Sequence, residues 1–260
     1  MKATFLLTLF VLSSPLMAQD KPAAIEKMPV TGKGEAAPPD LMPNQKAFLN
    51  LPEESRNAFL KGLGEATRLF QQKRVFETLE ELDKVAKIFE DSPEVYNIRG
   101  SCFVEMRAFD KALVEFKKAD ALAKDNPSIE FNIAEVYFCT KEWKKSLDLL
   151  LKILKETGDQ NMALSRLVEF KILLCEKKLG MNDEAKKLGD KYDFQDDSPF
   201  YYYAQAALAY EDNNLVKAEE WLAMAGRVFQ DANVLAPWQD TMVEYGYIKS
   251  FYGEDAAAEK

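Results

Sequence analysis

Histidine, the side chain that most often moves protons and ligates zinc, is absent from all 260 residues. A nucleophilic serine or cysteine would have no imidazole base beside it. Cys102, Cys139 and Cys175 lack the close pairing of a zinc site or a redox motif. Each lies in a strongly apolar stretch, so we expect small buried hydrophobic side chains. The sequence predicts no catalytic residue and no enzyme activity.

Carboxylates cluster between Asp190 and Asp197, ahead of Pro199. A calcium loop needs ligands at alternating positions and a turn glycine, and this segment has no such glycine. A solvated loop before the helix at Pro199 accounts for the cluster equally well. The pair Gly62 and Gly64 falls inside a helical pattern, not in a phosphate-binding loop. We therefore predict no metal and no cofactor.

The net charge of the chain limits the classes of partner that it can bind. The formal net charge is −9 and the pI is near 4.9, so phosphate backbones and anionic lipid surfaces repel the chain. We expect no nucleic acid partner. Apolar residues make up 47% of the sequence, which is enough to build a core.

The first residues have the pattern of an export signal. Lys2 precedes the apolar run Ala3–Leu12, and Ala18 ends a small-residue cleavage site. The run is about half the length that spans a bilayer, which needs roughly twenty residues. We predict a signal peptide over residues 1–18 and a periplasmic or secreted protein of the bacterial envelope, without stable membrane insertion after cleavage. An uncleaved tether is the alternative.

Residues 19–50 are rich in proline and alanine and poor in large apolar side chains. Such a composition buries too little surface to offset the entropy of ordering. We predict a flexible arm.

A repeat of 34 residues starts beyond this arm. Pro93 and Pro127 are 34 residues apart, and each follows a polar turn. Columns of small and large apolar residues stay in register at this interval: Ala66, Gly100 and Ala134; Leu69, Phe103 and Tyr137; Leu82, Phe116 and Leu150; Val85, Ala119 and Ile153. Recurrence at three and four residues within a block indicates two helices per repeat, and proline suits the start of a helix.

This pattern resembles the tetratricopeptide repeat, a helix–turn–helix unit with small residues where the helices approach. The segments Tyr96–Ala119 and Asn132–Leu147 carry the resemblance best, and weaker matches follow at Leu179–Ala185 and Tyr202–Ala225. Glu130 and Thr78 depart from the pattern. The resemblance implies an all-α, right-handed superhelical solenoid of antiparallel helix pairs, with about five units over residues 51–230.

Solenoid repeats need a polar cap at each end. The segment Pro237–Phe251 has the pattern of a final amphipathic helix. We predict a capping helix within residues 231–252 and a frayed tail over residues 253–260.

The resemblance also implies a concave groove lined by the first helix of each unit. The expected groove residues are Phe70, Asn97, Ser101, Val104, Glu105, Phe131, Glu135, Phe138, Phe170, Tyr203 and Tyr210. Aromatic anchors with a few polar groups suit a peptide or a helix as ligand. Asn97 alone has the residue type of a carboxylate clamp, so we do not expect one.

We therefore expect an exported scaffold that binds a protein or peptide in this groove, within a cell-envelope complex. Glu105, Glu135 and Glu211 favour a partner with apolar and neutral or basic side chains. The alternative is a self-associating structural module, a homo-oligomer without a peptide ligand.

Overall fold

The computed structural model describes residues 41–249, without the side chains of residues 159 and 160. This part of the chain is entirely helical, with twelve α-helices, one 3₁₀-helix and no strand. The elements are α1 (Pro43–Leu49), α2 (Glu53–Gln71), α3 (Val75–Ile88), α4 (Pro93–Glu105), α5 (Phe109–Leu122), α6 (Pro127–Cys139), α7 (Trp143–Thr157), η1 (Gly158–Asn161), α8 (Met162–Lys178), α9 (Asn182–Gly189), α10 (Phe200–Glu211), α11 (Leu215–Val228) and α12 (Ala232–Tyr245). The predicted signal peptide 1–18, the arm up to residue 40 and the tail 253–260 lie outside the described residues.

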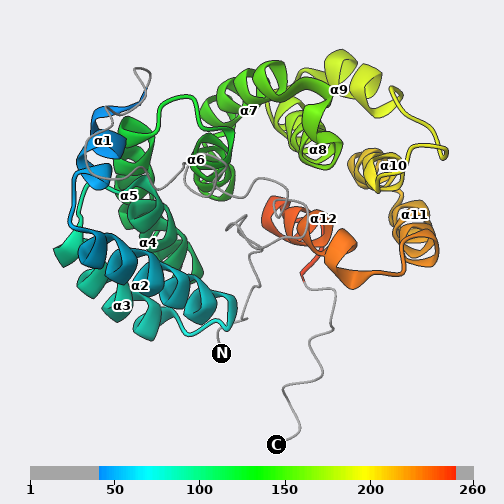
Figure 1. Ribbon diagram of the computed structural model, residues 1–260. Coiled ribbons are helices and arrows are strands. Elements are labelled where there is room, and N and C mark those ends of the chain that lie inside the picture. The colour runs from blue at the N-terminus through cyan, green and yellow to red at the C-terminus, as the bar shows by residue number, and fades with distance from the viewer. Residues whose placement is uncertain (1–40, 250–260) are drawn as a thin grey trace, which may run out of the picture. The chain divides into compact units, whose positions relative to one another are not determined.

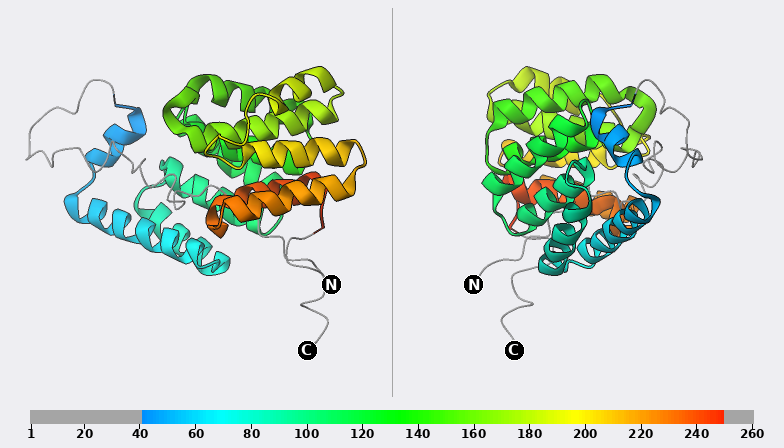
Figure 2. Two further views of the ribbon diagram at one scale, coloured as in Figure 1. Left: turned by 90° about the vertical axis from the view of Figure 1, so that its right-hand side faces the viewer. Right: turned by 60° about the vertical axis from the view of Figure 1, so that its left-hand side comes forward.

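The chain divides into two compact units between Ile133 and Ala134, inside α6. From here on, the first unit means the described residues up to 133 and the second unit those from 134, and a single repeat is called a helix pair. Within each unit, consecutive helices lie side by side as antiparallel pairs (Figures 1 and 2). The five pairs that run from α2 to α11 each consist of two helices joined by a short turn. The predicted all-α fold of antiparallel helix pairs is confirmed.

Side chains in the turns between pairs start the helices where the sequence predicts. Ser92 Oγ accepts a hydrogen bond from the Val95 amide at 3.3 Å, and Pro93 opens α4. Asn126 Oδ1 accepts from the Ser128 amide at 3.0 Å, and Pro127 opens α6. Proline has no amide hydrogen, so it is tolerated in the first turn, where helical amides have no partner.

The turn inside each pair has one backbone conformation, which the sequence did not reveal. Lys73, Arg107, Lys141, Gly180 and Asn213 have φ values of 58°, 56°, 63°, 77° and 57° and occupy the same place in the five pairs. In each turn the next amide reaches back to a carbonyl five residues earlier, as from Ala108 to Phe103 at 2.8 Å. This is the Schellman motif, for which glycine is the usual residue. Only one of the five turns has glycine.

The aligned small residues lie where helices approach closely. Ala66, Ala112 and Ala134 are fully buried. A Cβ atom on Gly100 of α4 would lie 2.6 Å from two ring carbons of Phe116 on α5. Phe116 is itself fully buried, so the absence of a side chain at Gly100 sets the spacing of this pair.

The end of the predicted arm is a helix, which corrects the expectation of flexibility up to residue 50. Helix α1 starts at Pro43, and the Gln45 side chain accepts a hydrogen bond from the Met42 amide at 3.0 Å. The ring of Phe48 is buried against Phe59 at 5.1 Å and Phe89 at 5.5 Å between centroids. A single aromatic anchor thus orders a segment that its proline-rich composition suggested was flexible.

The last helix starts earlier than expected. Helix α12 begins at Ala232 instead of Pro237, because Asp231 caps it by accepting a hydrogen bond from the Asn233 amide at 2.9 Å. Pro237 therefore lies inside the helix. The helix ends at Tyr245, because Gly246 adopts a left-handed conformation with φ 99°.

Candidate partner-binding face

The first unit buries most of the positions that the sequence assigned to a groove. Phe70, Asn97, Ser101, Val104 and Phe131 are each at most 5% exposed. Asn97 Oδ1 accepts a hydrogen bond from Asn132 Nδ2 at 2.9 Å, so this polar pair joins α4 to α6 inside the unit. The Ser101 hydroxyl donates to the Asn97 carbonyl at 3.0 Å. Whether any of these residues binds a partner stays a prediction.

Glu105, the acidic member of the predicted groove in this unit, has a partner within the chain. Its Oε1 lies 2.6 Å from Lys73 Nζ, and its side chain is 12% exposed. The Lys73 ammonium also lies 5.9 Å from the centre of the Phe70 ring. The carboxylate is therefore already neutralised, which weakens the sequence argument that it selects a basic partner.

The second unit brings four predicted groove residues to one surface. Phe138 of α6, Phe170 of α8, and Tyr203 and Tyr210 of α10 define what we call the inner face. Helix α12 lies along it, beside α8 and α10 (Figure 1). Three of the four residues, Phe138, Phe170 and Tyr203, are at most 1% exposed, whereas Tyr210 is partly exposed.

Trp238 of α12 makes the first set of contacts with the inner face. Its ring centroid lies 5.4 Å from that of Phe170, 5.6 Å from that of Tyr203 and 6.4 Å from that of Phe200. The indole is only 4% exposed. Burial raises the pKa of the Tyr203 hydroxyl above its ordinary value. The Trp238 ring therefore closes the middle of the inner face.

Tyr245 occupies the end of the inner face nearest α6. Its ring lies 6.3 Å from Phe138 and 5.7 Å from Trp143, and the ammonium of Lys178 lies 4.2 Å from its centre. A cation over an aromatic face is attracted by the ring quadrupole. Tyr245 is 5% exposed, so Phe138 is covered by α12 in this structure.

Two residues beyond Tyr245, Tyr247 covers Tyr210. Their rings stack with centroids 4.9 Å apart and planes 13° from parallel. The hydroxyls of Tyr245 and Tyr247 both donate to Glu211 Oε1, at 3.4 Å and 2.7 Å. Burial raises the pKa of both phenols, so they remain protonated donors. Glu211, like Glu105, already has partners.

Helix α12 carries acidic side chains whose charges affect Glu135 of α6. Glu135 is the remaining predicted groove residue, and its Oε1 lies 2.8 Å from Lys171 Nζ of α8. Burial raises the pKa of Glu135, and the carboxylates of Glu244 and Asp240 on α12 raise it further, against the lowering effect of Lys171.

Sequence reasoning missed that the occupant of the inner face is part of the same chain. The signal was present in the segment that was assigned only a capping role. Leu235, Trp238, Met242 and Tyr245 recur at three, four and three residues, which is the spacing of one helix face. All four are buried.

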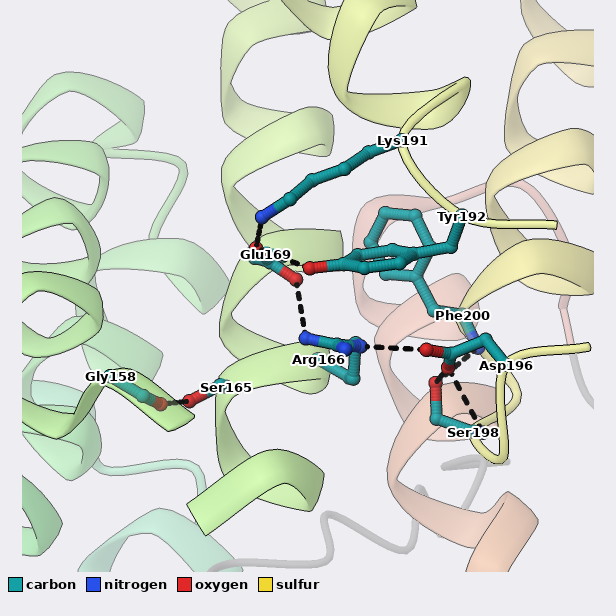
Figure 3. Close-up of polar contacts among 9 residues, drawn as sticks. All are labelled: Gly158, Ser165, Arg166, Glu169, Lys191, Tyr192, Asp196, Ser198 and Phe200. Carbon is teal, nitrogen blue, oxygen red and sulfur yellow. Dashed lines mark hydrogen bonds and ion pairs between the residues drawn. The ribbon is translucent and has the colours of Figure 1, made fainter. Parts of the chain in front are cut away.

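The acidic segment before α10 forms a polar network with α8, shown in Figure 3. Buried Glu169 accepts hydrogen bonds from Lys191 and from the Tyr192 hydroxyl, the latter at 3.1 Å. Arg166 Nε donates to Asp196 Oδ2 at 3.1 Å, and its guanidinium lies 3.8 Å from the centre of the Tyr192 ring. These cations hold the carboxylates and fix the loop before α10.

Cys102 and Cys175 are buried, as predicted, whereas Cys139 is partly exposed. Burial raises the pKa of Cys102 and of Cys175 to about 12 and raises that of Cys139 as well. Raised pKa values keep these thiols protonated at neutral pH. Among residues 41–249, no three cysteines or acidic residues are grouped as a metal ion would require. No helix in this range is long and apolar enough to cross a membrane.

No family model matches the chain, and no curated protein sequence is similar enough to match it. Several solved structures share its fold, and three of them illustrate the similarity. YrrB, described as a tetratricopeptide-repeat protein with an unusual peptide-binding site, is 20% identical, with 74% of this chain and 95% of that chain covered and a TM-score of 0.50. PilF of Pseudomonas aeruginosa is 16% identical, with coverage of 74% and 97% and a TM-score of 0.53. The apo form of the quorum sensor NprR from B. thuringiensis is 15% identical, with coverage of 77% and 62% and a TM-score of 0.55.

Proposed function

We propose that this chain, which has the tetratricopeptide-repeat fold, is a non-enzymatic scaffold that binds another protein through the inner face of its second unit. The observation that carries the proposal is the convergence of Phe138, Phe170, Tyr203 and Tyr210 on one surface that holds a helix. Stacked helix pairs commonly recognise partners with such surfaces, and aromatic anchors contribute most of the affinity. The peptide-binding site in the description of YrrB supports a peptide or protein as the ligand.

The absence of catalytic machinery in the sequence supports a binding role. The chain has no histidine, and the pKa values of its three thiols are raised. The buried carboxylates of Glu169 and Glu135 have lysine partners. A general base or an activated nucleophile has no candidate among these groups.

We further propose that the scaffold acts in the cell envelope, after export. The support is the apolar run Ala3–Leu12 and the small-residue site that ends at Ala18. Intact mass measurement on protein recovered from the envelope fraction should give a chain that begins at Gln19. A chain that retains Met1 would contradict cleavage, and recovery only from the cytoplasm would contradict export.

Site-specific photo-crosslinking tests the binding role. A photoreactive amino acid is placed at Tyr210, at the partly exposed edge of the inner face, or at Phe76, which is 69% exposed on α3. We expect one defined protein to crosslink in envelope preparations from position 210 and not from position 76. Equal products from both positions, or none from position 210, would refute the inner face as the binding site.

Self-association is the competing function, and exposed apolar side chains favour it. Phe76 is 69% exposed and Val216 of α11 is 71% exposed, and each would be buried in a contact between copies. Light scattering of the purified mature chain separates the two functions. A concentration-independent monomer mass excludes the self-associating module.

A further inference from the structure

Helix α12 makes the contacts of a bound peptide. Leu235, Trp238, Met242 and Tyr245 form one apolar face, and none of them is more than 7% exposed. Two aromatic anchors, Trp238 and Tyr245, are seven residues apart, or two helical turns. They contact the rings of Phe170 and Phe138 respectively. Helix-in-groove recognition uses anchors at this spacing.

Helix α12 does not continue the stack of helix pairs. A further repeat would place it mainly against α10 and α11, yet its backbone packs more closely against α8. The residues between the end of α11 at Val228 and the start of α12 at Ala232 form a short connection. Helix α12 also has no second helix with which to pair within the described chain.

Pro237 makes α12 a poor helix on its own. Proline inside a helix removes one backbone hydrogen bond and crowds the carbonyl four residues earlier. The Thr241 hydroxyl donates to the Pro237 carbonyl at 2.7 Å, one turn earlier in the same helix. A short helix with an internal proline is marginal in water, so α12 depends on the inner face for its structure.

We propose that α12 is a resident ligand of the inner face, and that a partner binds by displacing it with an amphipathic helix of matching chemistry. The partner helix presents bulky aromatic residues at positions i and i+7 and a methionine or leucine at i+4. The external partner rests on the proposed function, whereas the exchangeable helix does not.

A binding experiment in trans tests this directly. The ligand is a fluorescently labelled synthetic peptide with the sequence of residues 231–249, and its binding to the full mature chain is followed by fluorescence anisotropy. Native chain is compared with a Trp238→Ala chain, in which the resident helix loses its central anchor. We expect the variant to bind the peptide at least about tenfold more tightly, because less of the inner face is occupied.

Two altered peptides provide matched controls without any change to the protein. A peptide with alanine in place of the tryptophan should not bind, because it lacks the central anchor. A peptide with Tyr245→Ala should bind at least about threefold more weakly than the unaltered one, because it lacks the ring that contacts Phe138. Equal affinity for all three peptides would show non-specific association and would overturn the proposal.

Hydrogen exchange on the native chain gives an independent reading. We expect the amides of α12 to exchange through local opening at least about tenfold faster than the buried amides of α8. Exchange of α12 and α8 at one common rate would mean that α12 is an inseparable part of the unit, and would overturn the proposal. Loss of helicity across residues 134–249 in the Trp238→Ala chain would overturn it for the same reason.

These outcomes are separate from a failure of the proposed function. Peptide binding to a folded Trp238→Ala chain establishes the exchange, even if no protein crosslinks at Tyr210. A partner that crosslinks at Tyr210 while the peptide fails to bind the folded Trp238→Ala chain would leave a scaffold without an exchangeable helix.

Discussion

Gly100 and Gly64 are two helical glycines with opposite surroundings, and the same substitution should change stability in opposite directions. At Gly100, in α4, a Cβ atom would lie 2.6 Å from two carbons of the Phe116 ring. At Gly64, in α2, no heavy atom beyond its chain neighbours and the backbone of its own helix lies within 4 Å of the corresponding position. Both glycines belong to the first unit, so they report on the same packed structure.

The expected magnitudes follow from two opposing terms. Replacement of a helical glycine by alanine stabilises a helix by roughly 0.5–1 kcal/mol, because the unfolded chain loses freedom. Insertion of a methyl group into a full core costs about 1–3 kcal/mol, and Phe116 is fully buried with no solvent side toward which it can move. We expect Gly100→Ala to destabilise the first unit by about 0.5–2 kcal/mol, and Gly64→Ala to stabilise it by about 0.5–1 kcal/mol.

Urea unfolding followed by circular dichroism measures both free energies, with equal slopes required for a valid comparison. The double substitution should show the sum of the two effects, since the sites share no contact. Stabilisation of similar size by both substitutions would refute the claim that Gly100 sets the distance between α4 and α5. A Phe116→Leu change in the Gly100→Ala background should recover part of the loss, because it removes the ring that the new methyl group meets.

Three further outcomes can be measured on single variants. Burial, and then the charge of Glu184, raises the pKa of Glu176 to about 7. The folded state therefore holds this proton more tightly than the unfolded chain, so the stability of the fold decreases as pH rises from about 4.5 to 7. A Glu176→Gln variant should lose that part of the pH dependence of Tm. Arg166→Met should cost about 1–3 kcal/mol, because Glu169 and Asp196 each lose a charged hydrogen-bond donor. Lys217→Met at an exposed pair should change stability by at most about 0.5 kcal/mol; equal effects would refute the structural role of the network. Phe48→Ala should detach α1 alone, so limited proteolysis should cut before α2 while the rest stays resistant; an unchanged pattern would contradict the anchor.

The core of the repeats was predictable because the evidence for it is periodic. Gly100 recurs with Ala66 and Ala134, and the structure places a close helix approach at Gly100 and buries both alanines. Pro93 and Pro127 open helices as predicted. Small residues and prolines impose these positions through sterics and missing amides, so sequence alone suffices.

The remaining features depend on contacts that no local pattern specifies. Lys73, Arg107 and Lys141 adopt a conformation that favours glycine, and the surrounding Schellman hydrogen bonds enforce it. The order of α1 rests on Phe48 meeting Phe89, about forty residues away in the chain. The position of α12 depends on Trp238 reaching Phe170. For α1 and α12 a distant partner decides the position, and although the spacing within α12 marks one apolar face, it does not specify which surface that face meets.

Because the chain divides at Ile133, its two units differ in tryptophan fluorescence. All three tryptophans, Trp143, Trp221 and Trp238, belong to the second unit. Indole emission therefore reports on that unit alone, while far-ultraviolet dichroism reports on helices of both. Superimposable melting curves from the two signals would mean that the units unfold as one cooperative body; separated curves would assign each transition to its unit without any label.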